Sequence, residues 1–546
     1  MAPDPMVTAT PNTQMSQRRA VAGSAFGTLF EWYDFNLFAT LAVVLGAQFF
    51  AGAPEGMRAL FALLIFAVGF MVRPLGALIF GRLSDTKGRR TTFIATVLIM
   101  GLSTIAVGLL PGYAEIGILA PLLLLALRIL QGLAVGGEYG GAAVYLAEHV
   151  PAERRGLLTS FVQVSITAAF LLSLLLLLAL RQGLGEQSFA AWGWRIPFLL
   201  AVIPLAISVW MRLRLTESPV FLEMKRKGML SRSPLRDVFS DRKTVRTMVI
   251  VLFGLVAGQA VLGYGGQLYP YIFMLTVLKI DAFTATVLTA WAMAVTCVGF
   301  IVFGWLSDLV GRKPVIVAGL ILAVATIFPL FHGLASIANP DLERAQRSVS
   351  ITVASPADCA FQFNPVGTAR YAAPCDKIRA LLAAKGARFE TARAAETSVT
   401  IDATRIEGGD PDLAAKLASA LRTAGYPDPG SPGIVQVRSL GDILHPQALA
   451  MIAILSILGL YSAMVYAPLA AYLVELFPPQ IRTTALSLPY HIGNGWIGGL
   501  LPATAVALVI ATGNPYAGLW YLVTFAALSA VVSVLFLRGR DERSES

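Results

Sequence analysis

Two acidic residues, Glu31 and Asp34, stand three positions apart in the otherwise apolar segment GTLFEWYDFNLF. This spacing places both side chains on one face of a helix. A charge inside a membrane helix costs ~2.5–3.5 kcal/mol on insertion scales, so it usually marks a transport pathway or a coupling site. A carboxyl group in apolar surroundings can bind and release a proton near neutral pH, which makes both acids candidates for proton coupling. The alternative is a structural role in which an arginine of a neighbouring helix neutralises them.

Arg73, Arg128 and Glu138 also interrupt apolar segments. Arginine keeps its proton and presents a planar fork of donors that fits a carboxylate. Each arginine is therefore expected either to bind an anionic substrate or to neutralise Glu31 or Asp34. Glu138 is a further candidate for proton coupling, with a structural ion pair as its alternative.

Uncharged polar and aromatic side chains in the same segments predict a small-molecule site. His491 either titrates or is a neutral, buried group bonded to Asn494 or to a backbone carbonyl. The residues predicted to contact a substrate are Arg73, Arg128, Gln131, Tyr139, Gln259, Tyr264, Gln267, His491 and Asn494.

Long apolar segments dominate the chain, which has 546 residues, of which 56% are hydrophobic and 14% charged, and a mean hydropathy of +0.70. Segments of roughly 20 apolar residues span a bilayer as helices, because unpaired backbone groups are not tolerated in lipid. The composition therefore predicts an all-α membrane protein. The twelve expected spans are residues 22–50, 58–82, 91–111, 115–147, 157–180, 194–213, 246–277, 282–304, 314–332, 447–474, 483–511 and 515–537.

The formal charge of +10 is distributed in a pattern that predicts topology. Lys and Arg gather in alternate loops, such as 87–90, 154–155 and 212–246, and such enrichment is typical of cytoplasmic loops. The pattern explains the charge without a nucleic-acid partner. With an even number of spans, both termini are expected in the cytoplasm.

The decapeptide GRLSDTKGRR at 81–90 returns as GWLSDLVGRK at 304–313, which indicates two duplicated six-helix halves. A second pair, Glu148 in EHVPAERRG and Glu475 in ELFPPQIRT, supports the duplication. Its members are 327 residues apart, whereas the decapeptides are 223 apart, so the second half holds about 104 extra residues.

The extra residues form the polar, proline-rich segment 333–446, which the count of spans places outside the cytoplasm. Its patterning predicts a small α/β domain between helices 9 and 10, with a disordered loop as the alternative. Strand-like stretches are expected at 348–355, 397–406 and 433–439, and helical stretches at 376–385 and 411–424.

Two of the three cysteines, Cys359 and Cys375, lie in this segment. An exported pair is expected to form a disulfide, and closing a loop of about 17 residues stabilises a fold by roughly 3 kcal/mol. The alternative is two free, buried thiols. Cys297 lies inside a predicted span, and we interpret it as a packing residue.

Two six-helix halves, each with G-x-L-S-D-x-x-G-R-[RK] after its second helix, resemble the major facilitator superfamily. The segments GTLFEWYDFNLF, RPLGALIFGRLSDTKGRR, RILQGLAVGGEYGGAAVYLAEHVP and GWRIPFLLA resemble its metabolite:proton symporter family, which includes carriers of citrate, α-ketoglutarate, shikimate and proline or betaine. The resemblance covers both membrane halves but not the insert. It implies that the repeated loops form a cytoplasmic gate, whose residues are Gly81, Asp85, Gly88, Arg89, Gly304, Asp308, Gly311 and Arg312.

The resemblance and the membrane charges together predict a proton-coupled symporter of a small metabolite, and the two arginines favour an organic acid. If the acids of helix 1 neutralise these arginines, a zwitterion such as proline or betaine is the alternative. A receptor that uses the insert is a further alternative. A membrane enzyme is disfavoured because no H-E-x-x-H or G-x-S-x-G motif occurs, and no catalytic residue, metal site or cofactor is predicted.

The expected partners are the substrate, protons and the lipid bilayer, and the chain is expected to act as a monomer in the bacterial inner membrane. The predicted organisation is an N-terminal tail at 1–21, a first half at 22–213, a linker at 214–245, helices 7–9 at 246–332, a periplasmic insert at 333–446, helices 10–12 at 447–537 and a C-terminal tail at 538–546.

Overall fold

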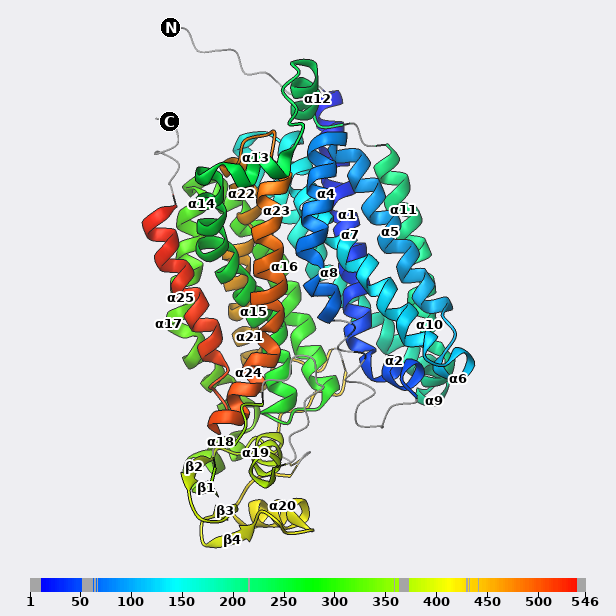
Figure 1. The fold of residues 1–546 in the computed structure, drawn as a ribbon. Coiled ribbons are helices and arrows are strands. Elements are labelled where there is room, and N and C mark those ends of the chain that lie inside the picture. The colour runs from blue at the N-terminus through cyan, green and yellow to red at the C-terminus, as the bar shows by residue number, and fades with distance from the viewer. Residues whose placement is uncertain are drawn as a thin grey trace.

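A computed structural model describes most of the chain as a bundle of long helices with a small sheet domain at one end (Figure 1). Parts of both predicted tails, 1–10 and 538–546, and the start of the expected span 58–82 lie outside the described residues. The described residues are 11–51, 62, 65, 67–214, 217–357, 359–362, 373–428, 431, 433–439 and 441–537.

The first half of the bundle contains the charged helices that the sequence singles out. Glu31 and Asp34 lie on α1, Arg73 is the first residue of α4, and Arg128 and Glu138 lie on α7. The helices are α1 (Pro11–Thr40), α2 (Ala42–Phe49), α4 (Arg73–Lys87), α5 (Arg89–Leu109), α6 (Tyr113–Ile116), α7 (Leu119–His149), α8 (Arg155–Leu184), α9 (Glu186–Ser188), α10 (Arg195–Leu200) and α11 (Val202–Leu213), with the short turns η1 (Ala152–Arg154) and η2 (Phe189–Gly193).

The linker forms two short helices, and the second half follows with the same helical architecture. Two π-helical turns interrupt this half, and such turns often lie at functional sites. The elements are α12 (Pro219–Arg226), α13 (Pro234–Ser240), α14 (Arg242–Val251), η3 (Leu252–Val256), α15 (Ala257–Thr276), α16 (Ala282–Val310), α17 (Arg312–Ala338), α21 (Pro446–Tyr466), α22 (Leu469–Leu476), α23 (Arg482–Ile492), η4 (Gly493–Gly498), α24 (Gly499–Thr512) and α25 (Leu519–Phe536).

Ten helical segments of the described chain are long and apolar enough to cross a membrane. The charged helix α1 and the 15-residue helix α4 are not among them. The ten segments are Arg89–Leu109, Leu119–His149, Ala152–Leu184, Phe189–Leu213, Arg242–Thr276, Ala282–Val310, Arg312–Ala338, Pro446–Leu476, Arg482–Thr512 and Leu519–Phe536.

The two most extensive contacts between the halves are those of α4 with α23 and of α8 with α16. The first glycine of each decapeptide makes this close approach possible. A Cβ on Gly81 would lie 3.0 Å from the Cα of Thr484, and a Cβ on Gly304 would lie 2.7 Å from the Cβ of Ser160. Real Cβ atoms hardly ever come this close to other atoms, so both positions favour glycine.

The insert is a small α/β domain built on a four-stranded sheet of order β2-β1-β3-β4. Strands β1 and β2 are parallel and are connected through α19, whereas β3 is antiparallel to both β1 and β4. Leucine, isoleucine and valine side chains of the helices and strands form its core. The elements are α18 (Pro340–Ser348), β1 (Ile351–Ser355), α19 (Pro374–Ala384), β2 (Glu390–Arg393), β3 (Ser398–Ile401), β4 (Thr404–Glu407) and α20 (Leu413–Thr423).

The insert differs in three respects from the expected pattern. Helix α17 continues to Ala338, so the insert starts later than residue 333. The stretch expected as one strand at 397–406 is a hairpin, because Asp402 adopts a positive φ of 48° at its turn. The stretch 433–439 is not a strand of the sheet, because its apolar side chains pack into the core of the second half instead.

The insert is docked on the second half of the bundle through several backbone contacts. The Phe389 N–H donates to the Gly513 carbonyl at 3.1 Å, at the connection between α24 and α25. The Val437 N–H donates to Thr284 Oγ1 of α16 at 2.9 Å. The Val435 N–H donates to the Ala338 carbonyl at 3.0 Å. These contacts attach the insert to one half of the bundle at the end opposite to α12 (Figure 1).

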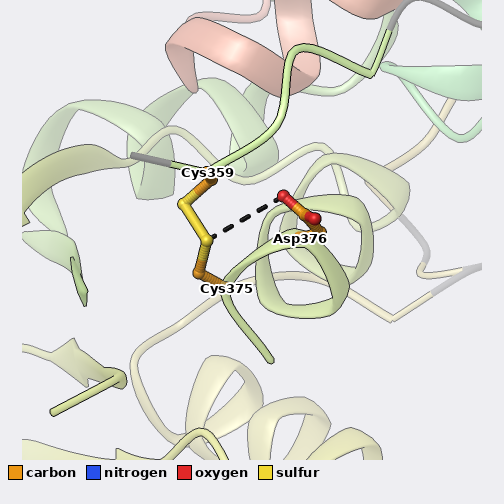
Figure 2. Close-up of side chains that lie close together, drawn as sticks. All are labelled: Cys359, Cys375 and Asp376. Carbon is orange, nitrogen blue, oxygen red and sulfur yellow. Dashed lines mark hydrogen bonds between the residues drawn. A yellow bond between two sulfur atoms is a disulfide. The ribbon is translucent and has the colours of Figure 1, made fainter. Parts of the chain in front are cut away.

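Cys359 and Cys375 are joined by a disulfide in the insert, at a Cα–Cα separation of 5.8 Å (Figure 2). The neighbouring Asp376 accepts a hydrogen bond from the Ala360 N–H at 2.8 Å, which holds the segment after Cys359 against the start of α19. These three side chains also lie close enough together to suggest a metal site. Metal ligation requires thiolates, however, and the disulfide leaves neither sulfur as one.

Candidate functional site

Asp34 is part of a closed, buried network in the first half. It forms an ion pair with Arg128 Nη1 at 2.9 Å, and Gln131 Nε2 donates to its other oxygen at 3.1 Å. Arg128 also donates to Gln131 Oε1 at 2.8 Å, and its guanidinium lies over the Phe38 ring at 3.8 Å. Of the two predicted roles for Arg128, the structure therefore contains the neutralising one.

Glu138 is likewise paired, with an arginine that the sequence analysis missed. Arg212 of α11 forms a buried ion pair with it, and Thr96 Oγ1 donates to its Oε2 atom at 2.8 Å. The sequence analysis counted Arg212 only as a topology signal, because it lies at the end of an apolar segment beside a basic loop. In the structure, the Arg212 guanidinium occupies the space that a Cβ on Gly27 would need.

Glu31 differs from the other two acids because its Oε2 atom is buried without a hydrogen-bond partner among the described residues. The residue itself is 4% exposed. Glu31 and Glu138 line the same very small cavity, of about 10 Å³, between α1, α5 and α7. Glu31 interacts electrostatically with two cations, Arg73 and Arg212, and with one anion, Glu138. It forms no direct ion pair with any of the described residues.

Arg73 is 2% exposed, and its Nε and Nη2 atoms have no hydrogen-bond partner among the described residues. Its guanidinium lies 4.2 Å from the Phe35 and Phe70 ring centroids and 5.7 Å from that of Trp32. These rings hold the side chain in place. Its Nε and Nη2 donors are therefore held in a fixed orientation, although neither donates a hydrogen bond to a described residue. It also interacts electrostatically with Tyr264 of the second half.

A central cavity of about 90 Å³ lies between the two halves. Four of the predicted substrate contacts line it: Gln259, Tyr264, Gln267 and Asn494. Gln259 and Asn494 exchange two side-chain hydrogen bonds of 3.2 and 3.0 Å. No charged residue is among the described lining residues, which are Trp32, Asn36, Ile166, Phe170, Gln259, Gly263, Tyr264, Gln267, Leu268, Met293, Tyr466 and Asn494.

The remaining predicted contacts lie outside this lining. Gln131 belongs to the Asp34 network, and Tyr139 and His491 are buried between α7 and α23. The considered bond between His491 and Asn494 is not formed, because Asn494 Nδ2 donates to Gln259 and to the Tyr490 carbonyl. The sequence alone cannot separate the helix face toward the cavity from the face toward the other half.

The first decapeptide contacts the opposite half. Asp85 accepts hydrogen bonds from the N–H groups of Thr483 and Thr484 at 3.3 and 3.0 Å, at the start of α23. Its carboxylate also lies 3.5 Å from Arg89. Gly88 forms the connection between α4 and α5 with a φ of 111°, which favours glycine.

The second decapeptide repeats this arrangement in the reverse direction. Asp308 accepts from the N–H groups of Gly156 and Leu157, both at 2.8 Å, at the start of α8. Arg312 lies 2.9 Å from its carboxylate, and Gly311 has a φ of 93°. Each aspartate thus caps a helix of the other half, and carboxylates are stabilised at helix N-termini.

The duplicated glutamates complete the contact between the halves at this end of the bundle, which we call the motif end. Glu148 pairs with Arg482 of the second half at 2.9 Å and lies 3.6 Å from Arg89. Glu475 lies 3.5 Å from both Arg155 of the first half and Arg312. The motif end is therefore closed by two symmetry-related sets of ion pairs and helix caps.

Comparisons with known proteins agree with this architecture. Residues 20–238 match the family described as "Sugar (and other) transporter". The proton:xylose symporter XylE of E. coli, bound to 6-bromo-6-deoxy-D-glucose, has the same fold, with a TM-score of 0.62, 16% identity and coverage of 96% of this chain and 97% of that one.

Curated relatives are more similar in sequence. The chain is 35% identical over 323 residues to the glycine betaine/proline/ectoine/pipecolic acid transporter OusA of Dickeya dadantii, which covers 58% of this chain and 64% of OusA. It is 35% identical over 334 residues to the inner membrane metabolite transport protein YhjE of Escherichia coli, covering 60% and 75%. A putative proline/betaine transporter of Staphylococcus aureus is 33% identical over 322 residues, covering 58% and 68%. The chain therefore belongs to the metabolite:proton symporter family of the major facilitator superfamily, whose members are membrane transporters and not enzymes.

Proposed function

We propose that the protein is a proton-coupled symporter of a small zwitterionic solute of the proline or betaine class. The observation that carries this proposal is the uncharged central cavity with Arg73 beside it. Trp32, Tyr264 and Tyr466 line the cavity, and aromatic faces attract a quaternary or secondary ammonium group. The donor fork of Arg73 suits a single carboxylate. A site with aromatic rings for an ammonium group and an arginine for a carboxylate matches a zwitterion.

The distribution of charge disfavours a substrate with several carboxylates. Three arginines reach the interior of the first half, and two of them, Arg128 and Arg212, already form ion pairs with Asp34 and Glu138. Arg73 forms no ion pair among the described residues. Arg73 alone can neutralise a monocarboxylate. The second and third charges of a citrate-like anion would remain uncompensated in a desolvated site. The names of OusA and of the staphylococcal relative point the same way.

An organic monocarboxylate is the second candidate, since Arg73 would serve it equally well. Uptake of radiolabelled glycine betaine and proline into proteoliposomes, with and without a pH gradient, tests the proposal. We expect gradient-driven accumulation that a protonophore abolishes, and competition by betaines that exceeds competition by di- and tricarboxylates. Gradient-driven uptake of an organic acid that betaines do not inhibit would contradict it.

We propose a topology with twelve membrane helices, of which α1 and the helix that ends at Lys87 add to the ten apolar segments. The motif end faces the cytoplasm, so that both termini are cytoplasmic and the insert is periplasmic. The basic residues near the motif end support this orientation through the positive-inside rule. The domain boundaries follow the sequence prediction, except that the insert domain begins after Ala338. The chain is proposed to function as a monomer in the bacterial inner membrane.

The motif end gives a testable prediction about the balance between the two transport states. In the double variant Asp85→Asn and Asp308→Asn, each aspartate loses its charge and becomes a weaker acceptor for the helix N–H groups. Hydrogen bonds to charged groups contribute ~1.5–3 kcal/mol, so we expect a shift of at least tenfold toward the state that is open to the cytoplasm. Distances between spin labels at Lys87 and Pro478, in a Cys297→Ala background, measure it.

A matched control for this variant is Asp281→Asn. Asp281 also caps a helix, α16, by accepting from the Thr284 N–H at 2.9 Å, but both residues belong to the same half. This control is expected to leave the label distances unchanged. Equal distance distributions in the double variant and the parent protein would show that the decapeptides do not close the motif end.

The insert is proposed to be an accessory domain outside the translocation path. Replacing residues 349–430 with a short Gly/Ser linker joins Ser348 to Ser431, which line the same surface depression. We expect membrane insertion and an uptake rate within about tenfold of the parent, or ~1.4 kcal/mol in barrier terms. Folded protein without uptake would instead assign the insert a role in transport.

A larger deletion of residues 338–442 provides the contrast. It removes Val435 and Val437, which are 6% and 4% exposed in the core of the second half. Burial of one such side chain contributes ~1.5–3 kcal/mol. We therefore expect the larger deletion, but not the smaller one, to lower the thermal stability of the membrane bundle.

A further inference from the structure

Two tyrosines from opposite halves are stacked in the middle of the protein. The rings of Tyr139 on α7 and Tyr490 on α23 are parallel within 2°, with centroids 3.7 Å apart. Each residue is 3% exposed. Aromatic pairs stabilise a structure by more than the apolar area that they bury. This stack is therefore a stabilising contact between the halves, separate from the ion pairs of the motif end.

The stack lies between the central cavity and the motif end. On α23, Thr484 at the motif end is six residues before Tyr490, or about 9 Å at the helical rise. Asn494, which lines the cavity, is four residues after Tyr490, or about 6 Å further. On α7, Tyr139 precedes Glu148 of the motif end by nine residues, or about 14 Å. A solute that leaves the cavity toward the motif end would meet this stack first.

Two residues that line the cavity hold Tyr490 in position. The hydroxyl groups of Tyr466 and Tyr490 are hydrogen-bonded to each other, and Asn494 Nδ2 donates to the Tyr490 carbonyl at 3.1 Å. On the other side, Gln163 Nε2 donates to the Tyr139 hydroxyl at 3.1 Å. A ligand that takes the Tyr466 hydroxyl as a hydrogen-bond partner competes directly with Tyr490.

We propose that Tyr139 and Tyr490 form an inner gate between the substrate cavity and the cytoplasmic motif end, and that Tyr466 is its latch. The inner gate must separate when the halves part on the cytoplasmic side, because one ring belongs to each half. The inner gate is a second barrier on the path from the cavity to the cytoplasm, in addition to the decapeptides. The inference rests on the alternating-access transport and the orientation proposed above, but not on the identity of the substrate.

The test measures access to the cavity from the cytoplasmic side without any substrate. The reporter is Gly263→Cys in a Cys297→Ala background, because a Cβ at Gly263 has ordinary contacts and faces the cavity. Inside-out vesicles are treated with a membrane-impermeant, charged thiol reagent, and the modification rate is recorded. The background also carries Asp85→Asn and Asp308→Asn, which weaken the motif end, so that the inner gate accounts for a larger share of the barrier.

Tyr490→Ala is expected to raise the modification rate about tenfold, the upper range for loss of an aromatic pair. Tyr139→Leu tests the same stack from the other half and serves if Tyr490→Ala does not fold. Combining Tyr139→Leu with Tyr490→Ala should add little to either single change, because both changes remove the same contact. Full additivity, or an unchanged rate in the single variants, would overturn the inner gate.

The latch is tested by Tyr466→Phe, which keeps the ring but removes the hydroxyl. We expect a rate at least twice that of the background. The control is Tyr461→Phe on the same helix, whose hydroxyl accepts from Thr326 at 2.8 Å and is not bonded to the stack. An equal effect of both changes, or none at Tyr466, would overturn the latch. Absence of betaine uptake by the parent protein, together with the expected rate changes in these variants, would contradict only the proposed substrate.

Discussion

Replacing Glu31 with glutamine is expected to abolish solute accumulation driven by a pH gradient, while exchange of solute without a gradient continues. Of the three acids considered for proton coupling, Glu31 has a buried oxygen without a hydrogen-bond partner in the described chain. It can therefore bind and release a proton without breaking an ion pair. One coupled proton supplies about tenfold accumulation per pH unit, since one unit corresponds to ~1.36 kcal/mol. Proteoliposome uptake at imposed pH differences measures the loss.

Asp34→Asn is the informative contrast to Glu31→Gln. It leaves the charge of Arg128 buried and uncompensated, and breaking one side of a buried pair destabilises a protein by ~3–5 kcal/mol. We expect a lower melting temperature and a lower yield of folded protein, whereas Glu31→Gln should leave both unchanged. Glu223→Gln changes an exposed linker carboxylate and is the neutral control. Normal gradient-driven accumulation in the Glu31→Gln variant would remove this residue from proton coupling.

Arg73→Gln is expected to raise the Kd for glycine betaine at least 100-fold. Two unused N–H donors point from this buried guanidinium, and each hydrogen bond to a carboxylate contributes ~1.5–3 kcal/mol. Arg73→Lys keeps the charge but loses the planar fork, so we expect an intermediate value. Calorimetric titration of the purified protein measures each Kd.

Choline gives this experiment an internal control, because it carries the trimethylammonium group of glycine betaine without the carboxylate. If Arg73 binds the carboxylate, the Arg73→Gln change should reduce the affinity for betaine much more than the affinity for choline. Equal losses for both ligands would indicate a distorted cavity. An unchanged Kd for glycine betaine would place the carboxylate away from Arg73.

The repeated decapeptide allowed the most detailed prediction from sequence, and physical constraints explain why. Gly81 and Gly304 face close helix contacts, Gly88 and Gly311 need positive φ values, and each aspartate lies one turn from its arginine. These requirements are local, so they leave a visible pattern. That each aspartate caps a helix of the opposite half is a tertiary fact, and nothing in the spacing of the residues indicates it.

Partners that come from distant helices were correspondingly missed. Arg212 looked like one more basic residue near a loop, because its pairing with Glu138 depends on how α11 packs against α5 and α1. Strand β2 of the insert was not predicted, since its residues, Glu390–Arg393, are all exposed and have no alternating apolar pattern. The stretch around Val435 was predicted as a strand because its apolar residues resemble one, although they pack against helices.

The attachment of the insert to the second half has a practical consequence for imaging. Because the Phe389 N–H bonds to the connection between α24 and α25 and the Val437 N–H bonds to Thr284 of α16, the insert can serve as an external marker for one half of the membrane bundle. An antibody fragment raised against α20 would add size and a recognisable shape for particle alignment in electron cryomicroscopy. Its angle to the bundle would also report directly how far one half rotates against the other.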